Sequence, residues 1–564
     1  MTAGVREKPR ESVRPRTPRR LPLPTLLALL VGFAGVGHRL ALLFADVPPT
    51  NSDEATMGLA ALHVARGDGF PVWFYGQAYM GTLEAYLAAP LVALAGPSVL
   101  VLRLPTLALY ALFLLLSWRL TRRLGGDRWY ALLVVAVLAL GSDRVVKNQL
   151  IAGGGYPELN PAGAALALLT VGLCVTGAGA RLPRWAAWGL VSGVLLWVDP
   201  LILPYVLTLG VLLVAWRWRE LAGRAGVVLA GTLLLGAAPM LADSIRHGRN
   251  PVAAVLAAGG TGAPADWADR LHGALVLGPP LAMGFCSPGR CATWQLWWAV
   301  AFPVLLVLAA LTAWHALRPG GPGSAERVSA GVRLALLGGA AGVLGAYAVS
   351  NAAGQTPIES SRYLSCLAVA VPALFWPLWQ AARRLTGLRK FAEVAVSEES
   401  GYRHLPEVES IKATGGRAAG RRARVAGAGA LAVLAGVLGT GAAATVDVVR
   451  TAPAVHAEAD RHRSLVDTLG ALDVRNVRGG YWTCNRLTYA TGENVLCAVV
   501  DDDLSPGFDR LPAYRREVAA DPDAAWVAPA GSPLAARLDE RVGAESGALD
   551  VVTVAGWRIY LPRR

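Results

Sequence analysis

Charged side chains are scarce in this chain of 564 residues. Only 16% of its residues are Asp, Glu, Lys or Arg, whereas 54% are hydrophobic, and the mean hydropathy is +0.43. A soluble protein carries about 25% charged residues, so the composition excludes an ordinary soluble fold. Apolar stretches of about 20 residues recur along the chain, which is typical of a protein that crosses a membrane many times.

Several sequence signatures are also missing. There is no Walker loop, and the stretch GDGF is too short to bind phosphate by itself. The membrane part has no Asp-x-Asp nucleotide-sugar signature, and the run Asp501–Asp503 falls in a polar tail, where it is typical of a solvated turn. No internal repeat is visible. No small-residue cleavage pattern follows the first apolar stretch, so we expect that stretch to be a membrane span.

The apolar stretches predict a mainly α-helical polytopic membrane protein of about eleven transmembrane helices. In the first outer loop, residues 54–66 and 78–95 are expected to form helices that lie along the membrane interface. The expected spans are 22–46, 99–118, 129–142, 159–178, 184–199, 201–216, 222–242, 295–317, 332–350, 363–382 and 425–447.

The net charge of +14 follows this topology and does not indicate a nucleic-acid partner. Most Lys and Arg residues lie on one side of the expected membrane, which is the positive-inside pattern. The N-terminus is then cytoplasmic, and the basic charge contacts anionic membrane lipids. The basic inside segments are 1–21, 119–128, 181–184, 217–224, 318–333 and 383–424.

Three parts of the chain follow from these patterns. Residues 1–21 form a basic, disordered cytoplasmic N-terminus. Residues 22–447 form the transmembrane domain, with 383–424 as a basic cytoplasmic loop. Residues 448–564 alternate helix-like and strand-like runs, which predicts a small α/β domain outside the cytoplasm.

The six cysteines fit this arrangement. Cys174 and Cys366 fall within spans, where a small apolar residue suffices. The remaining four form two pairs in an oxidising compartment, and each pair is a candidate disulfide, with four free thiols as the alternative. The pairs are Cys286 with Cys291 and Cys484 with Cys497.

Two acids, Asp53 and Glu54, stand side by side after the first apolar stretch, in the run NSDEATMGLA. One interpretation is a helix start, with Asn51 or Ser52 as the cap and the acids complementing the helix dipole. That account needs only one acid. Ionisable groups at membrane depth generally indicate function, and partial burial raises the pKa of a carboxylate, which helps it act as a general base.

The run SDEATMGLAALHVARGDGFPVWFYGQAYMGTLEAYLAAP, together with GGGYPELN and ESSRYL, resembles the GT-C superfamily of membrane glycosyltransferases. The similarity is to the group of protein O-mannosyltransferases and aminoarabinose transferases, which is glycosyltransferase family 39-like. It covers 22–447 by topology and the first 140 residues in detail. The tail stretch YWTCNRLTYATGENVLCAVV also resembles such proteins.

This resemblance implies an inverting transfer at the outer face of the membrane. The sugar moves from a polyprenyl-phosphate monosaccharide to an acceptor hydroxyl on a glycan, a lipid or a protein. Asp53 is then the general base, and Glu54 orients either Asp53 or the acceptor. Relatives differ in their use of a divalent metal, and this sequence has no clear set of metal ligands, so no cofactor is assigned with certainty and a divalent metal stays open.

Positive charge is expected near the leaving phosphate, which departs without an acid catalyst. Arg362 is the basic residue of the outer loop 351–362, and a guanidinium suits bidentate phosphate binding. The alternative is an arginine that snorkels and pairs with Glu359. Arg144 and Lys147 are second choices for the same phosphate, with lipid headgroups as the alternative.

Sugar-binding candidates lie in the outer loops. Glu158 follows the glycines of GGGYP, where the family often has an acid that contacts sugar or metal, and the alternative is a capping acid. Aromatic faces edged by amide and carboxylate groups bind sugars well, although interfacial aromatics also anchor membrane proteins. The other candidates are Tyr156, Tyr75, Gln77, Tyr79 and Glu84.

Two residues near these candidates have ordinary structural interpretations. His63 has no second His or Cys at ligand spacing, so we expect a structural role. Asp199 precedes Pro200, which is typical of a turn.

Two other functions stay open. A transporter or flippase for lipid-linked sugars would show paired halves or broken helices near the bilayer centre. A scaffold with a glycan-binding outer domain would not need the acid pair, Arg362 and the aromatic loop together. The enzyme hypothesis predicts that Asp53, Glu158 and Arg362 face one outer cavity. The composition, rich in Ala, Gly, Arg and Val, indicates a high-GC bacterium and hence a plasma-membrane enzyme that uses a polyprenyl carrier.

Overall fold

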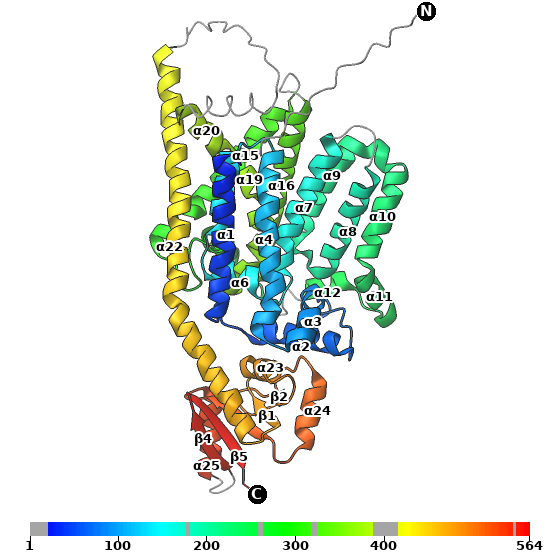
Figure 1. Ribbon diagram of the computed structural model, residues 1–564, viewed down its shortest axis with the longest axis vertical. Helices are drawn as coiled ribbons and strands as arrows, with labels where there is room; N and C mark the ends of the chain where they lie inside the picture. Colours follow the sequence, from blue (N-terminus) through cyan, green and yellow to red (C-terminus); the bar gives the residue numbers. More distant parts are fainter. Residues whose placement is uncertain are drawn as a thin grey trace, which may run out of the picture.

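The structure is a computed structural model that describes residues 21–175, 181–257, 263–318, 324–386, 416–544 and 549–563. A bundle of long helices forms the membrane body, and a small α/β unit lies beneath one end of it (Figure 1). The expected fold class is therefore confirmed. The basic segment 1–20 and residues 387–415 of the expected cytoplasmic loop lie outside the described residues.

In the described part, eight helical segments are long and apolar enough to cross a membrane, and two bent pairs raise the number to ten. The expected span 184–199 corresponds to α8 (Leu182–Val198), which is apolar but has only 17 residues and is too short to be counted among these. The bent pairs are α5 (Arg128–Ala139) with α6 (Asp143–Leu150), and α10 (Arg224–Gly236) with α11 (Ala238–His247).

The remaining helices of the membrane body have the following bounds. The long ones are α1 (Leu23–Phe44), α4 (Val99–Arg123), α7 (Tyr156–Val175), α9 (Leu203–Leu221), α15 (Trp298–Leu317), α16 (Ser324–Val349) and α20 (Trp376–Thr386). The short ones are η1 (Pro200–Ile202), α12 (Pro251–Ala257), α13 (Trp267–Leu271), the π-helical η2 (His272–Leu277), α14 (Gly278–Ala282), η3 (Thr293–Trp297), α17 (Asn351–Gln355), α18 (Pro357–Ser360), η4 (Ser361–Ala370) and α19 (Val371–Leu374).

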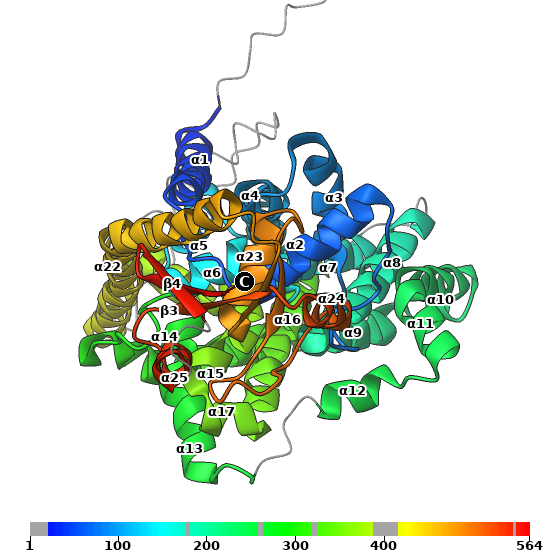
Figure 2. The ribbon, with the colours of Figure 1, turned by 90° about the horizontal axis from the view of Figure 1, so that it is seen from below.

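The first outer loop folds into two helices, α2 (Ser52–Arg66) and α3 (Leu83–Ala95), at the end of the bundle nearest the α/β unit (Figures 1 and 2). The Asn51 side chain caps α2 by accepting a hydrogen bond of 2.9 Å from the Glu54 backbone N–H. Asp53 and Glu54 lie in the first turn, where negative charge complements the helix dipole. The expected cap and the expected pair of loop helices are both present.

A single helix, α22 (Gly416–Ala471), connects the membrane body to the α/β unit. Its 56 residues span about 84 Å at 1.5 Å per residue, and Figure 1 shows it along the flank of the bundle and continuing below it. The helix runs unbroken through residue 447, where we expected the domain boundary. Asp46, just after α1, is 3.2 Å from Arg463 and 2.7 Å from His456 on the emerging part of α22.

The α/β unit contains a five-stranded mixed sheet of order β2-β1-β3-β5-β4. The strand β1 pairs in parallel with β2 and β3, whereas β5 pairs antiparallel with β3 and β4. A buried apolar cluster joins the sheet to the end of α22 through Leu465 and Leu469. The elements are β1 (Asn476–Gly479), α23 (Tyr481–Ala490), β2 (Leu496–Val499), α24 (Pro512–Ala520), β3 (Ala525–Pro529), α25 (Pro533–Ala544), β4 (Leu549–Val554) and β5 (Trp557–Pro562).

Candidate active site

The carboxylate of Asp53 lies at the junction of the membrane body and the α/β unit. Its Oδ1 accepts a hydrogen bond of 2.6 Å from the Tyr481 hydroxyl and one of 2.9 Å from Arg510 Nη2. In the described part of the chain, Oδ2 has no protein hydrogen-bond partner, and the side chain is 27% exposed. One oxygen is therefore fixed, while the other is available to accept a proton.

Glu54 has a different environment from its neighbour. It is fully buried, and Arg103 Nε and Nη2 each donate a hydrogen bond of 2.6 Å to its carboxylate. The Thr50 hydroxyl donates a further bond of 2.6 Å. Both oxygens of the Glu54 carboxylate are therefore occupied, and the ion pair with Arg103 holds the first turn of α2 in place. Arg103 was missed in the sequence, although a charged residue inside an apolar span is itself a signal that a partner exists.

Two arginines form a cationic patch next to Asp53. Arg362, at the start of η4, interacts electrostatically with Asp53 and with Arg144. The Nε atoms of both arginines are buried without a hydrogen-bond partner in the described part of the chain. Glu359 is exposed and forms no ion pair with Arg362 among the described residues. Buried donors without acceptors beside a second cation make this patch suited to an anion.

The other basic candidate, Lys147, lies three residues after Arg144 on α6. Lys147 is 3.7 Å from Asp143, one turn earlier on α6, and its side chain is 31% exposed. This arrangement is an ordinary ion pair between helix neighbours.

The aromatic residues of the first outer loop connect the patch to the α/β unit. Tyr79 interacts electrostatically with Arg362, Arg510 and Asp199, and burial, followed by the nearby Tyr363, raises the pKa of Tyr79. Tyr75, in contrast, forms a hydrogen bond with His63.

The Tyr75 hydroxyl is 2.6 Å from His63 Nδ1. Burial, followed by the Glu493 carboxylate, raises the pKa of Tyr75 to about 12. Gln77 has a buried Oε1 atom without a partner in the described chain, so its amide retains an acceptor that a ligand hydroxyl can use.

Glu84 and Glu158 are a pair of buried carboxyl groups in the same cluster. Burial, followed by the Glu158 carboxylate, raises the pKa of Glu84 well above its ordinary value, and the backbone N–H groups of Gly153–Gly155 oppose this shift. Oε1 of Glu84 and both carboxyl oxygens of Glu158 are buried without a hydrogen-bond partner in the described chain. Tyr156, also buried, interacts electrostatically with Arg362.

Asp199 links the acids to the arginines. Its Oδ1 accepts a hydrogen bond of 2.8 Å from the Leu201 backbone N–H, as expected for the turn before Pro200. Burial raises the pKa of Asp199 to about 7, and the carboxylate interacts electrostatically with both Arg362 and Glu158. One continuous electrostatic cluster therefore includes Asp53, Arg362, Asp199 and Glu158. Asp199 is both a turn residue and a member of this cluster.

The glycine-rich loop before Glu158 packs against the acid pair. A Cβ atom on Gly153 would lie 3.3 Å from the Glu54 backbone nitrogen and 3.4 Å from the Asp53 carbonyl carbon. These contacts are tighter than most Cβ contacts, so a side chain at this position would press against the α2 backbone. We expected these glycines to allow a ligand to approach, and the structure shows that Gly153 allows the approach of the α2 backbone.

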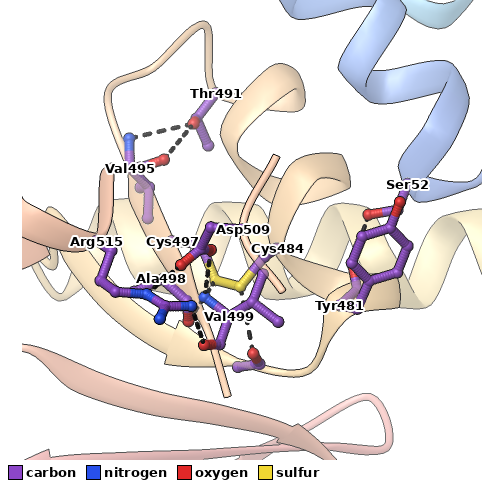
Figure 3. The surroundings of a disulfide bond; sticks show 11 residues. Ser52, Tyr481, Cys484, Thr491, Val495, Cys497, Ala498, Val499, Asp509 and Arg515 are labelled. Atoms are coloured by element: carbon purple, nitrogen blue, oxygen red, sulfur yellow. Dashed lines mark hydrogen bonds and ion pairs between the residues drawn. A yellow bond between two sulfur atoms is a disulfide. The ribbon is translucent and has the colours of Figure 1, made fainter. Parts of the chain in front are cut away.

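Both expected cysteine pairs are joined as disulfides, Cys286 to Cys291 and Cys484 to Cys497. The second bond links α23 to β2 close to Tyr481, whose backbone carbonyl accepts a hydrogen bond from Ser52 (Figure 3). The described residues contain no group of three or more His, Cys, Asp or Glu side chains arranged to hold a metal ion.

Sequence reasoning missed Tyr481 and Arg510. Tyr481 opens the stretch YWTCNRLTYATGENVLCAVV, which resembled family members without indicating a role. Arg510 carried no signal, because it is one of many arginines in a polar region.

No protein-family model matches the sequence, and no curated protein shows significant sequence similarity to it. Solved structures are similar in fold. ArnT from Cupriavidus metallidurans in the apo state has a TM-score of 0.54 at 14% identity, covering 96% of this chain and 97% of ArnT. ArnT bound to undecaprenyl phosphate has a TM-score of 0.53 with the same identity and coverage. The oligosaccharyltransferase of Archaeoglobus fulgidus has a TM-score of 0.47 at 11% identity, covering 90% of this chain and 69% of that one.

The similarity to ArnT extends over nearly the full length of both chains. It therefore includes the membrane body and the α/β unit together. The chain has the same overall fold as ArnT.

Proposed function

We propose that this protein is an inverting glycosyltransferase that moves a sugar from a polyprenyl-phosphate monosaccharide to an acceptor hydroxyl. The observation that carries the proposal is the half-occupied carboxylate of Asp53 beside a cationic patch. Oδ1 is fixed by two donors, whereas Oδ2 has no partner in the described chain. A base needs one free oxygen, and Asp53 has one.

The cationic patch supports a phosphate-linked donor. Arg362 and Arg144 each have a buried Nε atom without a partner in the described chain, and their charges repel each other. An anion between them satisfies both donors and removes the repulsion. A similar fold binds undecaprenyl phosphate in ArnT, which is the class of carrier that we propose here.

The proposed reaction needs only one proton transfer. Asp53 Oδ2 accepts the proton of the acceptor hydroxyl while that oxygen attacks the anomeric carbon of the donor sugar. The bond between the anomeric carbon and the phosphate oxygen breaks, and polyprenyl phosphate leaves with the electron pair. Arg362 and Arg144 stabilise the charge that develops on the phosphate. Attack opposite to the leaving group inverts the anomeric centre.

The acidic pair and the loop residues provide polar groups for the sugar. Glu84, Glu158 and the Gln77 amide each have a buried oxygen without a partner in the described chain, and these oxygens can bind sugar hydroxyls. Together with Tyr79 these groups can bind sugar hydroxyls from several sides.

The proposal includes the orientation of the chain in a bacterial plasma membrane. The N-terminus is cytoplasmic, and the α/β unit and the Asp53 cluster lie outside the cytoplasm. The basic inside segments support this orientation. The transmembrane domain then covers 22–447, and the outer domain begins where α22 leaves the membrane.

The test measures sugar transfer by membranes that contain the full chain, with radiolabelled polyprenyl-phosphate sugars as donors. We expect Asp53→Asn to lower kcat by about 10²–10⁴-fold, because it removes a general base. Arg362→Met should raise KM for the donor. A flippase would move labelled donor across the bilayer without forming product, and equal turnover by wild type and Asp53→Asn would remove Asp53 from the mechanism.

A further inference from the structure

The α/β unit contributes two side chains to the Asp53 carboxylate, from positions more than 400 residues away in sequence. We propose that Tyr481 and Arg510 are positioning residues for Asp53, so that the active site is complete only while the α/β unit is docked on α2. This inference rests on the proposed function, because it assigns residues to the same reaction. The α/β unit would then contribute to catalysis by orienting the base.

The sheet topology brings the two residues together. Tyr481 begins α23, two residues after β1 ends, and Arg510 lies in the connection between β2 and α24. Because β1 and β2 are parallel neighbours, both connections leave the same edge of the sheet. The carboxyl ends of parallel strands are the usual place for functional residues in open α/β sheets. Here that edge meets the start of α2 (Figure 2).

The contacts at Asp53 form a closed triangle of hydrogen bonds. Arg510 Nη2 and the Tyr481 hydroxyl both donate to Asp53 Oδ1, and Arg510 Nε donates to the Tyr481 oxygen over 2.8 Å. Arg510 Nη1 donates to the Tyr75 carbonyl over 3.2 Å. The guanidinium is therefore fixed at three points, and it orients Asp53 so that Oδ2 stays free.

Arg510 is also held by aromatic packing. Its side chain is 9% exposed, and its guanidinium lies 4.7 Å from the Phe74 ring centre and 5.4 Å from that of Phe508. Phe74 belongs to the outer loop and Phe508 to the α/β unit, so rings from both sides enclose the cation. A desolvated cation interacts strongly with rings and with a carboxylate. This enclosure fixes the charge next to the base.

A second set of contacts holds the unit in place away from Asp53. Glu493 Oε1 is 2.9 Å from His63 Nε2 on α2 and accepts a hydrogen bond of 2.6 Å from the Tyr514 hydroxyl, while Arg66 also pairs with Glu493. Tyr489 packs on Gly58 of α2, where an added Cβ would lie 2.6 Å from the ring. Docking can therefore be disturbed without changing any residue that touches Asp53.

The experiment compares the purified full chain with four variants under saturating donor. Arg510→Met and Tyr481→Phe remove the positioning contacts, Arg510→Lys keeps the charge, and Gly58→Leu disturbs docking. The matched control is Arg516→Met, an exposed arginine on the adjacent helix α24. Thermal unfolding and limited proteolysis establish that each variant is folded.

We expect Arg510→Met to lower kcat by about 10- to 100-fold with little change in KM for the donor, because a misplaced base slows the chemical step. Arg510→Lys should recover part of the loss.

The outcomes separate this inference from the proposed function. If wild type transfers sugar and Asp53→Asn does not, while Arg510→Met and Tyr481→Phe match Arg516→Met, the positioning role is wrong and the proposed function stands. If wild type transfers no sugar from any polyprenyl-phosphate donor, the proposed function itself fails. A rise in kcat in Arg510→Met would show that Arg510 blocks Asp53, which also overturns the positioning role.

Discussion

The ion pair between Glu54 and Arg103 allows a quantitative test of how the base is held. Both side chains are almost completely buried, and the guanidinium binds the carboxylate through two hydrogen bonds of 2.6 Å each. Arg103 Nη1 also donates 2.8 Å to the Pro48 carbonyl, just before α2. Removal of either partner leaves the other as an unpaired charge in a dry site.

We expect Arg103→Met to lower the free energy of unfolding by about 3–5 kcal/mol, and Glu54→Gln by a similar amount. The double variant should lose much less than the sum, because neither charge is then left unpaired. The measurement is denaturant-induced unfolding of the purified chain in detergent micelles, arranged as a double-mutant cycle. Both single variants should also lose transfer activity, since the start of α2 carries Asp53.

Arg39 provides the matched control for this cycle. It is also a fully buried arginine, but its described partners are neutral, namely Gln149 Oε1 at 2.9 Å and the Ala139 carbonyl at 2.6 Å. Arg39→Met leaves no unpaired charge, so it should cost less than Arg103→Met. Additive single variants, or equal costs for Arg39→Met and Arg103→Met, would refute the reasoning that charge pairing holds the start of α2.

Two further predictions concern the α/β unit. The pKa of Glu493 is lowered to about 2, because hydrogen bonds from His63 and Tyr514, aided by Arg66, outweigh the burial that would raise it. Its contribution to docking is present above the unfolded pKa of about 4.5 and is lost as the pH falls towards 2. As the pH falls from 5 to 2.5, the α/β unit of wild type should therefore become more sensitive to protease. The Glu493→Gln variant should be sensitive at both pH values. Loss of the Cys484–Cys497 bond in Cys484→Ser should cost about 3 kcal/mol, as for a loop of similar length, and a melting temperature unchanged by the substitution or by reductant would contradict this.

Much of the membrane body was predictable from sequence because apolar length is a strong and local signal. The cap at Asn51, the position of Asp53 and the helices of the first outer loop follow from residue types within a few positions of each other. The helix α8 shows the limit of this reasoning, since it is apolar but has only 17 residues.

The remaining parts of the site depend on contacts that no local pattern encodes. Asp199 was expected to be a turn residue, and it is one, but its contact with Arg362 and Glu158 arises only when α7, η1 and η4 pack together. In the same way, strands β1 and β3 have only four and five residues, and their pairing with neighbouring strands is what identifies them.

The contact between Arg510 and Asp53 depends most on the whole fold. The helix α22 carries the chain out of the membrane as one continuous rod, and its pairing with Asp46 fixes its direction close to the first span. The buried cluster around Leu465 and Leu469 then sets the sheet relative to that rod. With the rod and the sheet fixed, the edge that carries Tyr481 and Arg510 meets α2. The inference predicts that a flexible insertion in α22 between His456 and Leu465 lowers transfer activity as Arg510→Met does, while the membrane body stays folded.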